Sequence, residues 1–250
     1  MTNSGLQMSR RIRRTPFTDK AESHGVSGFT VVNHTLLPKS YQKTVEEDYW
    51  HLREYVQIWD VACQRQVEIA GPDAAKLIQM LTPRDLRCLK VGQCFYVPII
   101  DDNAGMINDP VLLKLAKGLA VGLGLDVDIF EPDVSPLAVQ GPKATALMND
   151  IFGDQIFDVP FFGFKAIPMF GKNQIIARSG YSKQGGFEIY LQGSHFGNEL
   201  WELIWKAGEP YNIWPGSPNL IERIEGGLMS YGNEFNRSNN PLECGFEHLC

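Results

Sequence analysis

The sequence of 250 residues predicts an α+β fold with an internal duplication. Two segments, 67–74 and 137–144, each have the pattern of a strand that ends at a Gly-Pro step and is followed by an apolar helix. The two steps begin at Gly71 and Gly141, 70 residues apart, which indicates a repeated supersecondary unit. Two unrelated strand-to-helix turns are the alternative. Alternating strand patterns between and after the two units complete the prediction.

The composition is that of a soluble globular protein. Hydrophobic residues make up 44% of the chain and charged residues 21%, enough for a substantial core. The net charge of -6 argues against a nucleic-acid partner, and no apolar run is long enough to span a membrane. The five cysteines form no C-x-x-C pair, so we expect reduced thiols in a cytoplasmic protein, and no metal site.

The first 43 residues are interpreted as a basic arm and lead-in, and residues 44–250 as the main domain. Arg10, Arg11, Arg13 and Arg14 form a basic cluster before any acid. A transit peptide has such a cluster. However, Pro16 follows at once and no amphipathic helix is evident, which favours a solvated arm.

Periodicity predicts the elements of the main domain. Residues 44–59 repeat apolar side chains at helical spacing, with acids in the first turn. Strands are expected at 95–100 and 106–113, joined into a hairpin by turn residues 101–105. A strand pair at 174–178 and 187–191, and helices at 195–206 and 218–231, follow.

Two acids on predicted strands are candidate functional residues. Asp109 lies between Ile107 and Val111, although an Asp beside Pro110 is also typical of a turn or sheet edge. Glu188 alternates with apolar residues directly after two glycines, and its two oxygens could bind a planar pair of donors. A solvent-facing glutamate is the alternative. Motifs for triad hydrolysis, nucleotide phosphates and zinc are absent.

Six ordered motifs resemble one family, the folate-binding methyltransferases related to the glycine-cleavage T-protein. The motifs are VEIAGPDA (67–74), GQCFY (92–96), GMIND (105–109), LAVQGPKA (137–144), RSGYSKQGGFEIYL (178–191) and IERIEGGLMSYG (221–232), and PLECG (241–245) continues the series. The resemblance implies duplicated ferredoxin-like α+β subdomains around a folate site. The family's C-terminal β-barrel is expected to be absent.

The resemblance also implies roles for individual residues. Asp109 matches the aspartate beside the reactive pterin nitrogens and is the expected catalytic residue. Glu188 matches the glutamate that binds the pterin's amino edge. The remaining expected folate-binding residues are Tyr96, Arg178, Tyr190 and Arg223.

Departures from the aminomethyltransferase pattern favour a branch that demethylates a sulfonium compound. These are Gly180–Gly186, Asn108-Asp109-Pro110, the arm 9–17, and the stretches 57–62 and 161–164. Tetrahydrofolate would then accept the methyl group, and the small sulfonium substrate and folate would be the partners. A homodimer remains open.

Two other functions remain open. They are a glycine-cleavage aminomethyltransferase and a non-catalytic folate-binding module.

Two departures from the family pattern bear on every one of these functions. A family strand is expected to be missing near residues 115–116, where Leu115 runs directly into Ala116, and the chain stops at Cys250. Unpaired backbone groups at such a gap would be costly, so activity of the shortened chain is in question.

Overall fold

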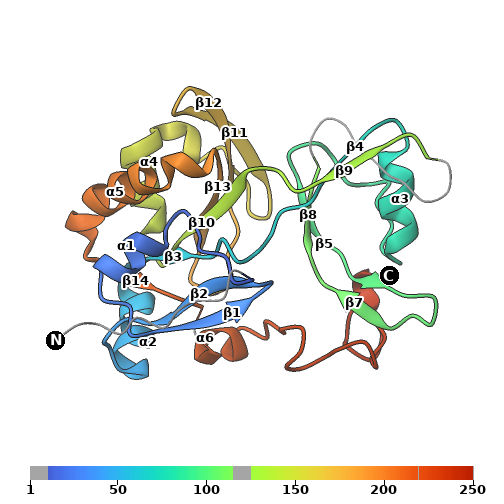
Figure 1. Ribbon diagram of the computed structural model, residues 1–250, viewed down its shortest axis with the longest axis horizontal. Coiled ribbons are helices and arrows are strands. Elements are labelled where there is room, and N and C mark those ends of the chain that lie inside the picture. The colour runs from blue at the N-terminus through green and yellow to red at the C-terminus, as the bar shows by residue number, and fades with distance from the viewer. Residues whose placement is uncertain (1–10, 115–124, 219, 250) are drawn as a thin grey trace.

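The computed structural model describes residues 11–114, 125–218 and 220–249. These residues form two lobes (Figure 1). The large lobe contains a six-stranded sheet with the helices that cover it, and the small lobe contains residues 68–114 and 125–130. Two linkers connect the lobes. Residues 61–67 lead from β3 of the large sheet to β4 of the small lobe, and residues 131–133 lead from β9 back to β10 of the large sheet.

The large sheet has the strand order β11-β12-β13-β10-β3-β14. Neighbouring strands are antiparallel, except that β14 is parallel to β3. Its strands are β3 (Val56–Asp60), β10 (Val134–Gln140), β11 (Phe164–Met169), β12 (Lys172–Ala177), β13 (Gly186–Gln192) and β14 (Ile213–Gly216).

Helices α4 (Ala144–Phe152) and α5 (Gly197–Gly208) cover one face of this sheet (Figure 1). The main core lies between these helices and the sheet, and Leu147, Phe187 and Trp201 are fully buried there. Each such side chain contributes about 1.5–3 kcal/mol by leaving water. The opposite face carries Glu188 and is the face toward which the small lobe packs.

Residues before β3 form the rest of the large lobe. Helix α1 (Thr18–Ser23) precedes a hairpin of β1 (Gly28–Val32) and β2 (Thr35–Ser40), and α2 (Val45–Glu54) follows. A capping box between Thr44 and Glu47 begins α2. From residue 11 on, the basic arm lies against this lobe. Arg14 pairs with Asp19 and Glu22 of α1, and Thr15 donates a hydrogen bond to the buried Asp60.

The small lobe consists of short elements in three two-stranded sheets. Strand β4 pairs with β9, β5 with β8 and β6 with β7, all antiparallel. The elements are β4 (Glu68–Ala70), α3 (Ala74–Leu81), β5 (Cys94–Tyr96), β6 (Ile99–Ile100), β7 (Met106–Asn108), β8 (Val111–Leu113) and β9 (Asp128–Phe130).

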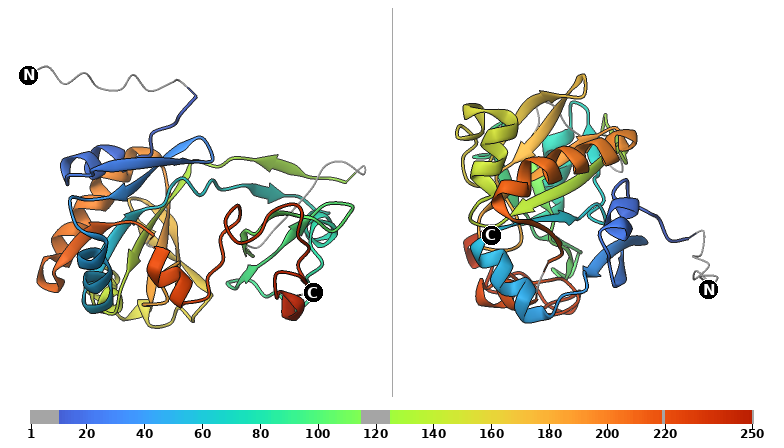
Figure 2. Two further views of the ribbon diagram at one scale, coloured as in Figure 1. Left: turned by 90° about the horizontal axis from the view of Figure 1, so that it is seen from below. Right: turned by 90° about the vertical axis from the view of Figure 1, so that its left-hand side faces the viewer.

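After the sheet, α6 (Leu220–Glu225) leads into residues 226–249, here called the C-terminal segment. This segment runs from the large lobe to the small lobe and ends beside β7 (Figures 1 and 2). Four short 3₁₀ turns complete the secondary structure: η1 (Asp154–Ile156), η2 (Ser194–Phe196), η3 (Glu209–Tyr211) and η4 (Glu247–Leu249).

The two strand–Gly-Pro–helix units have the same local geometry, as the duplication predicts. Gly71 and Gly141 adopt φ of +132° and +122°. A Cβ on either would lie 2.3 Å from a backbone oxygen, that of Asp126 or of Tyr55. In both units the helix begins three residues after the glycine, so only glycine fits at this turn.

Several element boundaries differ from the prediction. The helix expected at 44–59 ends at Glu54, because residues 56–60 pair as β3 with β10 and β14. The helix expected at 218–231 covers only residues 220–225, since Gly226 and Gly227 end it. Pro98 and Pro110 divide the predicted hairpin into four short strands.

Other predictions are confirmed or lie outside the description. The strands at 67–69, 137–140, 174–178 and 187–191 and the three helices that follow residues 72, 142 and 195 are observed, within a few residues of the expected bounds. The β1–β2 hairpin and β11 were not predicted. The gap expected near residues 115–116 lies outside the described residues, and the domain boundary at 43/44 remains a prediction.

We expect Gly141→Ala to lower the free energy of unfolding by about 3 kcal/mol or more, since the added methyl group meets the Tyr55 oxygen in a strained backbone conformation. Gly171→Ala is the matched control. Its φ is +72°, but nothing lies within 4 Å of the new Cβ, so about 1–2 kcal/mol is expected. Equal losses for the two variants, measured by urea denaturation, would contradict the close approach at Gly141.

Candidate functional site

Glu188 occupies the centre of the large sheet. It lies on β13, opposite Ala138 of β10 and Ala177 of β12, and is 9% exposed. The Ser179 hydroxyl donates a hydrogen bond to Oε2, and the Tyr190 hydroxyl donates another to the same oxygen at 3.4 Å. Oε1 has no hydrogen-bond partner among the residues that the structure describes. The carboxylate thus has one oxygen available to a ligand.

Burial raises the pKa of Glu188, and the hydrogen bonds from Ser179 and Tyr190 oppose that shift. Among the described residues, no arginine, lysine or histidine contributes to this shift of the pKa. Burying a carboxylate without a cationic partner lowers the free energy of unfolding. An acid whose pKa is raised by burial in this way is a candidate functional group.

Asp109 lies at the break between β7 and β8. The Tyr96 hydroxyl donates to its Oδ2 at 2.8 Å, and its own backbone N–H donates to the Asn108 side chain at 2.9 Å. Burial raises the pKa of Asp109, while the hydrogen bond from Tyr96 lowers it. Asp109 also helps to raise the pKa of the Tyr181 hydroxyl, although burial raises it more, so Tyr181 lies near it.

Strand β5 places the two acids in one site. Cys94 and Tyr96 project from the same face of the strand, about 7 Å apart. Cys94 packs against Tyr190, and the charge of Glu188 contributes to raising the pKa of its thiol, after burial. Tyr96, two residues on, holds Asp109. The acids therefore border one region, at the junction of the large sheet and the small lobe.

The loop after β12 also extends from Glu188 to Asp109. Ser179 bonds to Glu188, and two residues later Tyr181 lies near Asp109 and Arg223. The Tyr181 hydroxyl donates to the backbone oxygens of Met229 at 2.6 Å and Leu228 at 3.2 Å. Sequence patterns alone did not single out Ser179 or Tyr181, although both lie inside the motif at 178–191.

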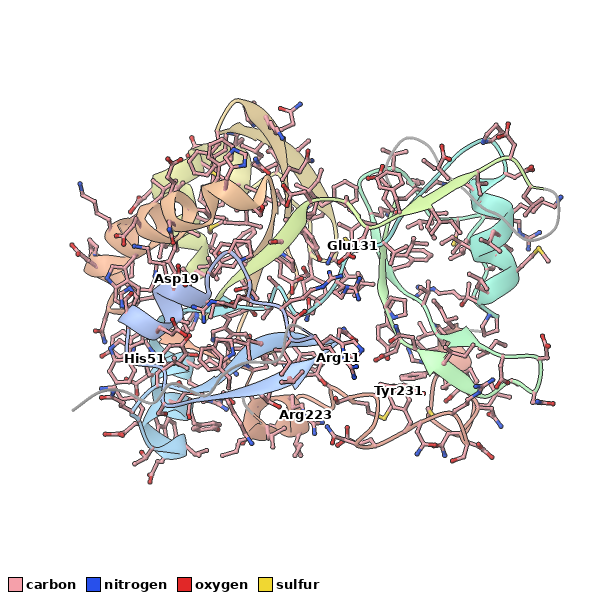
Figure 3. The ribbon with its side chains drawn as sticks, in the orientation of Figure 1. Arg11, Asp19, His51, Glu131, Arg223 and Tyr231 are labelled. Atoms are coloured by element: carbon pink, nitrogen blue, oxygen red, sulfur yellow. The ribbon has the colours of Figure 1, made fainter. Side chains whose placement is uncertain are left out.

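Arg223 projects from α6 at the lower edge of the large lobe (Figure 3). Its side chain is 6% exposed. Both terminal nitrogens donate to the carboxylate of Glu234, at 2.8 and 3.0 Å, and Nη1 also donates to the Leu228 oxygen at 3.1 Å. The guanidinium group is thus held by the protein itself.

Arg178 is not brought into contact with the other expected site residues. Its guanidinium lies 5.9 Å from the ring centroid of Phe187, a residue of the main core under the helices. Its side chain has no hydrogen bond or ion pair within the described part of the chain. Tyr190 and Tyr96, in contrast, contact the two acids directly.

One groove of the molecule lies away from the acids. Its volume is about 560 Å³, and its lining includes Arg13, Arg65, Glu131 and His195. Arg13 and Arg65 both pair with Glu131 there, between the basic arm and the two linkers. Figure 3 shows Glu131 beside the strand that joins the lobes. Since its cations are paired with an acid, this groove is not an obvious anion site.

The described residues contain no cluster of three or more His, Cys, Asp or Glu side chains arranged to hold a metal ion. Among the helices that the structure describes, none has the length and apolar character needed to cross a bilayer.

Comparison with known proteins identifies the family. The family model of the GCVT N-terminal domain matches residues 17–121 and 119–250, which is nearly the whole chain. The chain therefore belongs to the GcvT family, as the six motifs predicted. The two adjoining matches divide the chain near residue 120.

Two relatives and one solved structure describe its place in the family. The chain is 49% identical to dimethylsulfoniopropionate demethylase DmdA of Ruegeria pomeroyi, over 97% of this chain and 71% of that protein. It is 29% identical to the aminomethyltransferase of Thermoanaerobacter pseudethanolicus, over 84% of this chain and 63% of that one. The crystal structure of aminomethyltransferase T from Bartonella henselae superposes with a TM-score of 0.80 at 23% identity, covering 92% of this chain and 67% of that chain, and confirms the fold.

The burial of Glu188 predicts a pH dependence of stability. Because the pKa of Glu188 in the folded chain lies above its ordinary value of 4.5, its stabilising contribution is present in full below pH 4.5. That contribution is lost as the pH rises through the folded-state pKa. We therefore expect Glu188→Gln to become more stable relative to the wild type as the pH increases above 4.5, measured by urea denaturation across pH.

Glu47→Gln is the control for this measurement. The pKa of Glu47 is lowered by its capping hydrogen bonds with Thr44, so its contribution is present at neutral pH and is lost as the pH falls. The difference between this variant and the wild type should have the opposite dependence on pH. A stability difference for Glu188→Gln that stays constant with pH would contradict a buried, uncompensated carboxyl group.

Proposed function

We propose that the chain catalyses the tetrahydrofolate-dependent demethylation of dimethylsulfoniopropionate, giving 5-methyltetrahydrofolate and 3-(methylthio)propanoate. The observation that carries the proposal is 49% identity to a dimethylsulfoniopropionate demethylase over 97% of the chain. The more distant aminomethyltransferases have 27–30% identity. We further propose a cytoplasmic enzyme, with a homodimer to be tested by light scattering.

The residues around Glu188 fit the pterin part of a folate. A reduced pterin presents an amino group and a ring N–H along one edge, and a carboxylate accepts hydrogen bonds from such a pair. Oε1 of Glu188 is available for this purpose, while Ser179 and Tyr190 fix the other oxygen. Tyr96 borders the same region through Asp109. We assign Arg178 to folate binding on the family resemblance alone. Arg223 was expected to bind folate on the same ground, but both of its terminal nitrogens donate to Glu234, so we do not assign it a contact with folate.

The chemistry requires alignment more than acid catalysis. The bond between sulfur and the methyl carbon breaks as the bond between that carbon and the pterin nitrogen forms, and the electron pair stays on sulfur, which leaves as a neutral thioether. The protein must hold the two reactants in line and exclude water. Aromatic faces such as those of Tyr96 and Tyr190 favour a cationic sulfur nearby.

Asp109 is the group assigned to the proton. The pterin nitrogen loses a proton when it gains the methyl group, and an ionised carboxylate within hydrogen-bond reach can orient the nitrogen and accept that proton. The partly buried position of Asp109 and its bond from Tyr96 fit this role, because both fix the direction of the carboxylate.

Incubation of the purified chain with tetrahydrofolate and dimethylsulfoniopropionate tests the proposal. Both methyltetrahydrofolate and 3-(methylthio)propanoate should appear, in equal amounts. Turnover only with an aminomethylated lipoyl carrier protein would favour an aminomethyltransferase instead. Tight tetrahydrofolate binding without turnover by any donor would favour a folate-binding module. Either of these results would overturn the demethylase assignment.

We expect Asp109→Asn to lower kcat at least 100-fold, since the amide cannot accept the proton. The dissociation constant of tetrahydrofolate should change little, because Glu188 is intact. Asp102→Asn, in the exposed turn of the same hairpin, is the control and should retain wild-type turnover. Unchanged turnover in Asp109→Asn, in an assay of methyltetrahydrofolate formation, would exclude the proton-accepting role.

Tyr96→Phe should shift the pH profile of turnover. The Tyr96 hydrogen bond lowers the pKa of Asp109, so its loss raises that pKa. Turnover needs ionised Asp109, and the acid limb of kcat should therefore move to higher pH. Tyr181→Phe is the control, because the Tyr181 hydroxyl donates to backbone oxygens and not to Asp109. An acid limb at the same pH in Tyr96→Phe and the wild type would disprove the assignment of that limb to Asp109.

A further inference from the structure

The ion pair between Arg223 and Glu234 organises the start of the C-terminal segment. Glu234 accepts both terminal nitrogens of the arginine and also the backbone N–H of Ser230, at 2.8 Å. Arg223 in turn donates to the Leu228 oxygen. Two parallel bonds between a guanidinium and a carboxylate fix both groups in direction as well as distance. The turn at 228–234 is thereby closed around the pair.

This turn connects the large lobe to the strand that precedes Asp109. Tyr231, at the centre of the turn, donates from its hydroxyl to the Met106 oxygen at 3.1 Å. The backbone N–H of Met106 donates to the oxygen of Asn239, farther along the segment, at 2.9 Å. Figure 3 shows Tyr231 between α6 and the small lobe. Both backbone groups of Met106, the first residue of β7, are thus bound by the C-terminal segment.

Packing reinforces these bonds. Met106 and Phe235 are almost completely buried in one cluster, together with Phe246. The ring of Phe246 also contacts the ring of Tyr96, with centroids 5.4 Å apart. The two features that locate Asp109 are therefore β7, which ends directly before it at Asn108, and Tyr96, which bonds to it. Both contact the C-terminal segment.

We propose that Arg223 and Glu234 are a positioning pair that holds Asp109 at the reaction centre through the C-terminal segment, an inference that rests on the proposed function. The arginine acts on the reaction without touching a ligand. Its two terminal nitrogens are occupied by Glu234 and Leu228, and the side chain is 6% exposed. A guanidinium in this state is a structural clamp and offers little to an incoming anion.

Three variants and a control test the pair. Glu234→Gln removes the charge that Arg223 needs, Arg223→Lys keeps a cation but loses the two parallel bonds, and Tyr231→Phe removes only the bond to Met106. Glu225→Gln is the control. It breaks the ion pair between α6 and Arg53, whose two side chains are 38% and 50% exposed.

We expect kcat to fall at least tenfold in Glu234→Gln, less in Arg223→Lys and about threefold in Tyr231→Phe, while the dissociation constant of tetrahydrofolate stays within twofold of the wild type. Amide hydrogen exchange at residues 105–109 should accelerate in the same order. Glu225→Gln should match the wild type in all three measurements. The separation of kcat from folate affinity distinguishes positioning of Asp109 from a general loss of the site.

Two results would overturn the proposal. One is a weaker folate affinity with unchanged kcat, which would make Arg223 a ligand contact. The other is unchanged exchange at residues 105–109 in Glu234→Gln and Tyr231→Phe. If the wild-type chain shows no demethylation, the proposed function fails, and the exchange measurement still decides whether the pair holds the hairpin that carries Asp109. Tyr231→Phe keeps the test decisive if Glu234→Gln does not fold.

Discussion

The packing of β5 against the face of the six-stranded sheet that carries Glu188 is the contact on which the site depends. One face of that sheet is closed by α4 and α5, so Glu188 on the other face needs a cover that leaves room for a ligand. Strand β5 supplies it, with Cys94 against Tyr190. The same strand then presents Tyr96 to Asp109. A single three-residue strand therefore sets the distance between the two acids.

The short connections between the lobes enforce this contact. Linkers 61–67 and 131–133 leave the large sheet from neighbouring strands, and Arg65 in the first pairs with Glu131 in the second. The C-terminal segment adds a third connection on the other side, where it binds Met106. With three connections, the small lobe has few ways to move relative to the sheet. That rigidity suits a reaction that depends on alignment.

The two acids differ in what opposes the cost of their burial. Asp109 is partly buried and receives a hydrogen bond from a tyrosine, and Glu188 is buried more deeply with two hydroxyl partners. Neither has a cation as an ion-pair partner within the described residues. Arg223, the buried arginine of α6, is instead paired with Glu234. The site therefore holds its acids without internal charge compensation, which favours ligands that bring N–H donors or positive charge.

The sequence predicted the parts of this structure that local chemistry determines. Both glycine turns were evident because glycine and proline have specific backbone requirements. The acids at 109 and 188 were singled out by the family motifs, since strand alternation alone left a turn position and a solvent-facing side chain open. Helix ends were less well predicted, because residues 56–59 satisfy a helical period and yet gain more by pairing with β10 and β14. Tertiary packing overrides propensity at such places.

Long-range partners were beyond sequence reasoning. The match of Arg223 to a family position gave no indication of its bond to Glu234, eleven residues on, which exists only because the turn at 228–234 closes. The same applies to Ser179, whose hydroxyl meets Glu188 across a loop. Conversely, Arg178 was expected in the site, but its side chain lies against Phe187 of the main core. Its role in folate binding remains a prediction.

A crystal structure of this chain with tetrahydrofolate bound tests the single site most directly. The amino edge of the pterin should bond to Oε1 of Glu188, and the reactive ring nitrogens should lie within hydrogen-bond reach of Asp109. Arg223 should remain paired with Glu234. A pterin bound in the groove beside Arg13 and Glu131, or one that contacts only one of the two acids, would contradict the single site on which the proposed reaction depends.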